Sequence, residues 1–175
     1  MSAGSRPNPR RAGLVLAGAT LVFGIVWFTI LVAGPDTVPG HFAADGTPTR
    51  WDSTPVFLGM MAALAGGLTL LFVAMPRLMA RVPIEHVNLP NREQWNTPAR
   101  RAHLALLMTE DLRLIGAVTM LLLAAMLVIS ALAGLGAEIA GWVFLATAAA
   151  YLVMIGIIVG RMLTGSRYTP PADFS

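Results

Sequence analysis

The stretch Leu114–Leu135, LIGAVTMLLLAAMLVISALAGL, decides the fold, because it is apolar and contains no Asp, Glu, Lys, Arg or His. A helix of about 20 residues rises far enough to cross the ~30 Å hydrocarbon core of a bilayer. Three more uncharged apolar stretches have this character: Ala12–Ala33, Val56–Met75 and Trp142–Gly160. The chain is therefore predicted to be an all-α membrane protein with four transmembrane helices.

The composition limits the chemistry that such a protein can perform. Of its 175 residues, 56% are hydrophobic and 12% are charged, whereas about a quarter are charged in soluble domains. Ionisable residues inside a bilayer are the usual carriers of proton relays and ion pathways, and the four stretches contain none. The chain has no Cys, which excludes disulfides and thiol chemistry. We therefore expect a non-enzymatic protein with no catalytic residues and no cofactor.

The arginines predict the orientation in the membrane. All twelve basic residues are Arg, and all except Arg50 lie at the N-terminal end, between residues 76 and 113, or at the C-terminal end. The positive-inside rule places these regions in the cytoplasm. The predicted layout is a cytoplasmic tail 1–11, a membrane domain 12–162 and a cytoplasmic tail 163–175. Within that domain we predict an outer loop 35–55, an inner loop 76–113 and an outer turn 136–141.

The same residues suggest where the protein resides. An Ala- and Arg-rich composition without Lys is typical of a GC-rich bacterial source, so the expected location is the bacterial cytoplasmic (plasma) membrane. The high pI does not indicate a nucleic-acid partner, because the arginines flank the membrane spans and do not form one basic face with readout elements. The expected partners are the lipid bilayer and either another membrane protein or an envelope peptide.

Small residues recur at helical spacing in two spans. Gly59, Ala63 and Gly67 lie four residues apart, and the fourth span carries Ala146, Ala150, Gly156 and Gly160. Such patterns let transmembrane helices approach closely, so these faces are predicted to pack. The alternative is that they recur by chance in a chain rich in Ala and Gly.

The inner loop leads into the third span. Thr97-Pro98 predicts a helix start, with Thr as N-cap and Pro at the first helical position. Two interpretations of the following residues remain open. One is an amphipathic surface helix from Ala99 to Met108, with Thr109, Glu110 and Asp111 capping a separate third span. The other is one continuous tilted helix from Pro98 onward.

The outer loop is dense in turn residues. Asp45-Gly46 predicts a tight turn over residues 44–47, which would bring His41-Phe42 back toward Arg50-Trp51 at the outer interface. We interpret the loop as a small ordered cap that serves as a recognition surface. One His near two carboxylates falls short of the three or four ligands of a stable metal site, so no metal is predicted. A pH-sensing His41 is the alternative.

Two motifs resemble a known family. The residues from Val38 to Trp51, VPGHFAADGTPTRW, are similar to the loop Pro-x-His-Phe-x-x-x-Gly-x-x-x-x-Trp of a bacterial membrane domain of unknown function. That domain also forms the N-terminal part of SdpI-type immunity proteins, which protect against a secreted sporulation-delaying toxin. The inner stretch Asn88 to Trp95, NLPNREQW, with Pro98 and Arg100-Arg101 after it, resembles the inner loop of stand-alone members.

The resemblance adds importance to residues in both motifs. The candidate recognition loop comprises Pro39, His41, Phe42, Asp45, Gly46, Arg50 and Trp51, and the candidate inner motif comprises Asn88, Pro90, Asn91, Trp95 and Arg100. The alternative for these residues is fold maintenance. In the immunity proteins a further membrane region follows the domain, whereas this sequence ends shortly after Arg161.

Three functions are compatible with these observations. The first is a binding, sensor or protective module that acts through its outer loop. The second is an accessory or scaffolding subunit that packs on larger membrane proteins through its small-residue faces. The third is a small transporter, in which an apolar cavity carries a hydrophobic substrate without charged groups.

Overall fold

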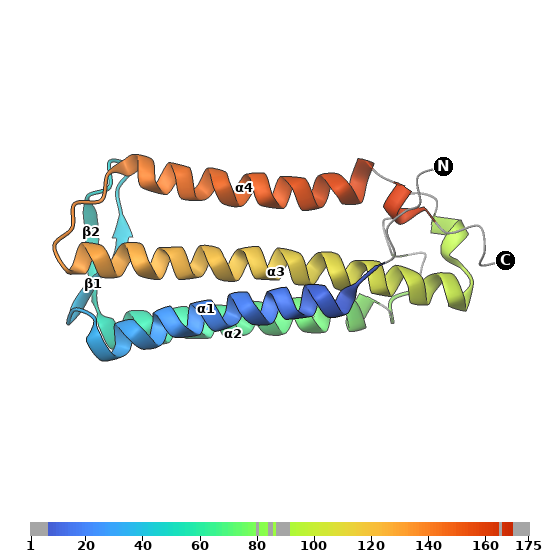
Figure 1. Cartoon of the computed structure of the whole chain (residues 1–175), viewed down its shortest axis with the longest axis horizontal. Coiled ribbons are helices and arrows are strands. Elements are labelled where there is room, and N and C mark those ends of the chain that lie inside the picture. The colour runs from blue at the N-terminus through green and yellow to red at the C-terminus, as the bar shows by residue number, and fades with distance from the viewer. Residues whose placement is uncertain (1–6, 80, 84–85, 87–91, 165, 170–175) are drawn as a thin grey trace.

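The computed structural model describes residues 7–79, 81–83, 86, 92–164 and 166–169. Long helices form most of the fold (Figure 1). In chain order the elements are α1 (Pro9–Ala33), β1 (Thr37–Phe42), β2 (Pro48–Ser53), α2 (Thr54–Met79), the 3-10 helix η2 (Arg92–Trp95), α3 (Pro98–Gly134), α4 (Gly141–Thr164) and the 3-10 helix η3 (Ser166–Tyr168).

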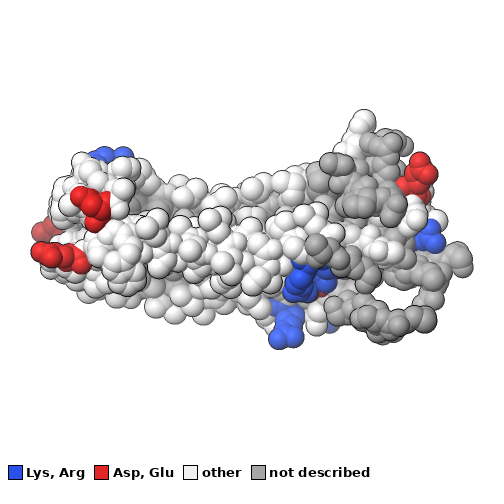
Figure 2. Space-filling view, turned by 90° about the horizontal axis from the view of Figure 1, so that it is seen from above, with Lys and Arg blue, Asp and Glu red and all other residues white. Residues whose placement is uncertain are grey.

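Four helices in the described part of the chain are long and apolar enough to cross a membrane. They are α1, α2, α3 and α4, and each matches one predicted span, although the third span was predicted to extend one residue past α3, to Leu135. Charged residues gather at the two ends of the molecule, while the middle of the face in Figure 2 is uncharged. The all-α, four-span prediction is therefore confirmed, and the chain has the architecture of a multi-pass membrane protein.

The helix α3 is the centre of the bundle. In its most apolar window 56% of the residues are buried, against 22% for α1, 17% for α2 and 6% for α4. Helices α1 and α2 lie together on one side of α3, and α4 lies on the other (Figure 1). The main core joins Leu16 and Phe23 of α1 and Leu58 of α2 to Met120 and Leu127 of α3.

The inner loop leads into one continuous helix, which decides between the two alternatives. Thr97 caps α3, its side chain accepting from the Arg100 backbone N–H at 3.4 Å, and Pro98 occupies the first turn as predicted. At 1.5 Å per residue the helix is about 55 Å long, well beyond the ~30 Å hydrocarbon core. The prediction of a separate surface helix is therefore wrong. Thr109, Glu110 and Asp111 lie inside α3 and cap nothing.

The predicted small-residue faces do not pack within this chain. A Cβ built on Gly59, Gly67 or Gly156 would meet no atom within 4 Å. Close approach occurs elsewhere, because a Cβ on Gly116 of α3 would press on the ring of Phe72 in α2. The prediction that these faces join the four helices to one another is therefore wrong, and they remain exposed on the surface.

The outer loop 35–55 forms a β-hairpin. Strands β1 and β2 pair antiparallel, with His41 opposite Arg50 and Pro39 opposite Trp51, and the pairing is irregular next to His41. The tight turn that was predicted to bring these pairs together is confirmed, although the strands themselves were not expected. The hairpin lies at the end of the bundle opposite the ends of α1 and α4 that carry Pro9 and Thr164 (Figure 1).

Candidate functional site

The hairpin is anchored to the bundle through β1. Val38 and Pro39 are buried, and Val38 belongs to the main core. Gly134, the last residue of α3, lies so close to Thr37 and Val38 that a Cβ there would press on both. One strand therefore fixes the hairpin to the end of the central helix.

The turn of the hairpin docks on the outer turn between α3 and α4. Gly46 has a φ of +96°, which favours Gly, and a Cβ there would overlap the carbonyl oxygen of Ile139. Asp45 Oδ1 accepts hydrogen bonds from the Thr47 hydroxyl at 2.6 Å and from the Thr47 backbone N–H at 2.9 Å. These bonds to the Thr47 side chain and backbone lower the pKa of the Asp45 carboxyl, because they favour its charged form.

A ring contact ties the end of β1 to α4. The Phe42 and Phe144 rings are tilted by 45° with their centroids 4.8 Å apart, within the range of favourable aromatic pairs. Together with the docked turn, this contact joins the hairpin to both α3 and α4. The hairpin therefore packs on the end of the bundle as the ordered cap that was predicted.

The other strand faces outward. Five of the six residues of β2 are exposed, and Trp51 keeps 51% of its surface accessible. Arg50 and Asp52 form an ion pair at 2.9 Å beside Gly40, where a side chain would overlap the Asp52 carboxylate. His41 Nδ1 lies 2.6 Å from the Thr49 hydroxyl. Because side chains alternate along a strand, Arg50 and Asp52 lie on one face of the hairpin and Trp51 on the other, so β2 offers a charged pair and an aromatic ring on different sides.

The inner motif is partly described. Trp95 is fully buried, and its ring lies parallel to that of His103 with centroids 6.5 Å apart. Leu104 and Leu107 complete this small inner cluster, and Arg100 donates to the Gln94 carbonyl at 3.1 Å. In this position Trp95 holds η2 on the start of α3. The predicted Asn88, Pro90 and Asn91 lie outside the described residues.

A group of charged and polar residues that was not predicted as a site lies at the same end. Arg167 donates two hydrogen bonds to Asp111, at 2.8 and 3.0 Å, and the Tyr168 hydroxyl donates to the same carboxylate at 2.8 Å. Arg167 also pairs with Glu110 at 3.3 Å, and Glu110 accepts from the Asn8 backbone N–H at 2.7 Å. We call these five residues the inner clasp. It joins the start of α1 and η3 to α3.

Burial and charge set the electrostatics of the inner clasp. Burial lowers the pKa of Arg167, but hydrogen bonds and charge attraction from Asp111 and Glu110 outweigh it, so the pKa is raised overall. Burial and the neighbouring Asp111 carboxylate raise the pKa of the Tyr168 hydroxyl well above its ordinary value. Arg167 therefore stays charged and Tyr168 stays protonated as a donor.

These arrangements support binding and structural roles. Among the described residues, no group of three or more His, Asp or Glu side chains could hold a metal ion. Comparison with known proteins gives no match to a protein-family model, a curated protein or a solved structure.

Proposed function

We propose that this chain is a non-enzymatic binding module of a bacterial cytoplasmic membrane, whose hairpin binds an extended peptide outside the cell. The observation that carries the proposal is the contrast between the two strands. Val38 and Pro39 fix β1 in the protein, whereas β2 is exposed at five of its six residues. The sheet has two strands, so the outer edge of β2 has no partner strand among the described residues.

Such an edge supports strand addition. Extended peptides join exposed sheet edges through main-chain hydrogen bonds, and flanking side chains supply specificity. Trp51 and Arg50 belong to the residue types that most often dominate binding energy at interfaces. The resemblance of the loop to that of SdpI-type immunity proteins points to a protective role, in which a secreted peptide is captured at the membrane.

The test is selection of peptides on the protein in lipid nanodiscs. A displayed library of random peptides is selected against the wild type and depleted on empty nanodiscs, and the affinities of enriched peptides are measured by biolayer interferometry. We expect Trp51→Ala to weaken binding at least about tenfold, equivalent to ~1.4 kcal/mol. Trp142→Ala is the matched control, because Trp142 is an exposed Trp at the start of α4.

Two results would overturn the proposal. One is a library with no enrichment over empty nanodiscs. The other is a set of peptides that bind Trp51→Ala and Trp142→Ala equally well. The thermal unfolding midpoint of both variants in the same nanodiscs verifies that the hairpin remains folded.

A second candidate function rests on the exposed small-residue faces. A Cβ at Gly59, Gly67 or Gly156 has open space around it, and α4 is buried over only 6% of its most apolar window. An accessory subunit would use these faces to pack on a larger membrane protein. Cross-linking in native membranes tests this role, because a partner that is lost when Gly67 is changed to Leu supports it. Absence of any stoichiometric neighbour would contradict it.

A further inference from the structure

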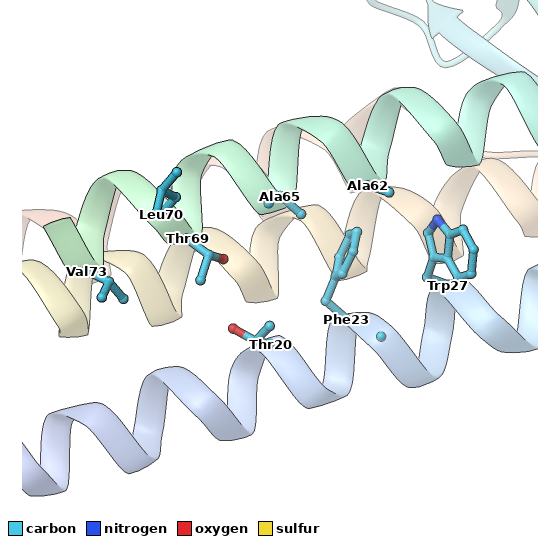
Figure 3. A pocket seen from close by; sticks show the side chains of 10 residues that line it. Thr20, Phe23, Trp27, Ala62, Ala65, Thr69, Leu70 and Val73 are labelled. Carbon is cyan, nitrogen blue, oxygen red and sulfur yellow. The ribbon is translucent and has the colours of Figure 1, made fainter.

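An apolar groove of about 550 Å³ runs between α1 and α2 (Figure 3). Side chains from both helices project into it, among them Phe23 and Trp27 from α1 and Ala65 from α2. Phe23 and Ala65 belong to the buried core, and Thr69 contacts Met120 of α3. The groove is therefore closed on the side that faces α3 and open on the side that faces away from α3.

The polar atoms of the groove have partners within the protein. The Thr20 hydroxyl donates to the Leu16 carbonyl at 2.9 Å, and Trp27 Nε1 donates to the Leu58 carbonyl at 2.9 Å. The Thr69 hydroxyl lies 3.5 Å from Met120 Sδ. The groove consequently offers a ligand only apolar surface, and its occupant within the membrane must be hydrocarbon or an apolar side-chain face.

The dimensions favour a hydrocarbon chain. Along α2 the groove extends from Ala62 to Val73, about 16 Å at 1.5 Å per residue, which is close to half of the ~30 Å hydrocarbon core. Its volume of about 550 Å³ lies within the ~300–1,000 Å³ range of ligand pockets. A Cβ on Gly24 or Gly66 would meet no atom, so neither position obstructs the opening.

An arginine stands at one end of the groove. Arg77 follows Val73 by four residues on α2 and therefore extends the same helix face, about 6 Å further along. Its side chain is exposed, and one of its five N–H donors bonds the Val73 carbonyl at 3.1 Å. Guanidinium groups bind phosphate through paired hydrogen bonds. An apolar groove that leads to a guanidinium matches the chemistry of an anionic phospholipid.

We propose that the groove is a binding site for an anionic glycerophospholipid, with one acyl chain between α1 and α2 and its phosphate on Arg77. The site opens at the end of the bundle that carries the arginines, which the positive-inside rule assigns to the cytoplasmic leaflet. The proposal is independent of the hairpin and of any peptide that it binds.

Native mass spectrometry of the full chain released from nanodiscs tests the proposal. The discs contain equal amounts of phosphatidylglycerol and phosphatidylcholine with identical acyl chains. We expect the wild type to retain one phosphatidylglycerol at least about fivefold more often than phosphatidylcholine. Arg77→Gln should abolish this preference, whereas Gly66→Phe should reduce the retention of both lipids, because the ring occupies the groove.

Matched variants separate a specific site from general lipid contact. Arg161→Gln removes an exposed arginine from the last turn of α4, and Gly156→Phe adds a ring on the open face of α4. Both should behave like the wild type. The thermal unfolding midpoint in the same discs verifies that each variant is folded. We expect both Phe variants to fold, because a Cβ on Gly66 or Gly156 meets no atom within 4 Å.

Three outcomes would overturn the proposal. If Arg77→Gln and Arg161→Gln lose the preference for phosphatidylglycerol equally, the arginines attract the surrounding lipid and there is no specific site. Unchanged retention in Gly66→Phe would place the lipid elsewhere. A dimer mass that is lost in Gly66→Phe would show that a second copy occupies the groove.

Discussion

Asp111 accepts two hydrogen bonds from Arg167, 56 residues further along the chain. Asp111 is buried and the Arg167 side chain keeps only 9% of its surface accessible, so the pair fastens η3 to α3 at the end of the bundle that carries Pro9 and Thr164. Tyr168 donates to the same carboxylate, and Glu110 extends the contact to Asn8. The inner clasp thus holds three segments together through one pair of acidic residues on α3.

Removing one partner of this pair should destabilise the protein strongly. Arg167→Ala leaves the Asp111 carboxylate buried without its counter-ion, and we expect a loss of about 3 kcal/mol in the free energy of unfolding. The double variant Asp111→Asn/Arg167→Gln should lose less free energy of unfolding than the two single variants together, because neither charge is then isolated. Denaturant unfolding in detergent measures both values. Arg161→Ala is the exposed control and should change stability by less than ~0.5 kcal/mol; an equal loss there would contradict a specific role for the pair.

Tyr168→Phe should remove the part of the stability that the protein loses at alkaline pH through Tyr168. Burial and the Asp111 carboxylate raise the pKa of Tyr168 from 10.0, so the folded protein favours the neutral phenol. Its contribution to the free energy of unfolding is complete below about pH 10 and declines at higher pH, where the unfolded chain ionises. At neutral pH we expect Tyr168→Phe to cost about 2 kcal/mol through the lost hydrogen bond. Denaturant midpoints between about pH 8 and pH 11 test this, and parallel curves for wild type and variant would contradict it.

Gly46→Ala should loosen the hairpin from the outer turn. A Cβ at this positive-φ position would overlap the Ile139 carbonyl, so we expect a loss of about 1–3 kcal/mol in hairpin stability, measured by amide hydrogen exchange over residues 37–53. Gly136→Ala is the matched control, because Gly136 has a φ of +91° but open space around it. Equal effects would mean that backbone strain alone matters and that the docking contact contributes nothing.

The predicted orientation can be tested by single-cysteine labelling, because the natural chain has no Cys. We expect His41→Cys in the hairpin to react with a membrane-impermeant maleimide on intact cells. Arg161→Cys at the end of α4 should react only after the membrane is permeabilised. Labelling of both positions in intact cells would contradict cytoplasmic termini, and the unsubstituted chain supplies the background.

The sequence was sufficient to predict the four membrane spans, but it was not sufficient to predict the residues at which their helices begin and end. Uncharged apolar runs predict membrane helices because a bilayer admits little else. The start of α1 at Pro9 depends on a local cap, in which Asn8 accepts from the Arg11 backbone N–H, and apolar content does not reveal it. The sequence alone does not distinguish a continuous α3 from two separate helices, because Thr109, Glu110 and Asp111 also suit a helix start.

The candidate sites were predictable where they depend on local residues. Asp45-Gly46 predicts its turn from short-range chemistry, and the turn is present. The strands beside it were missed because Pro39, Gly40 and Pro48 are poor strand formers. The inner clasp and the α1/α2 groove depend on residues far apart in the chain, and neither helical periodicity nor spacing indicates which distant side chains meet.

The length of α3 has a mechanical consequence. This helix touches the hairpin at Gly134 and the inner clasp at Asp111, and no proline interrupts it between those points. Its backbone hydrogen bonds run without a break from one end of the bundle to the other, at a rise of about 1.5 Å per residue. The hairpin and the inner clasp are therefore connected by one uninterrupted helix, which fixes the separation between them.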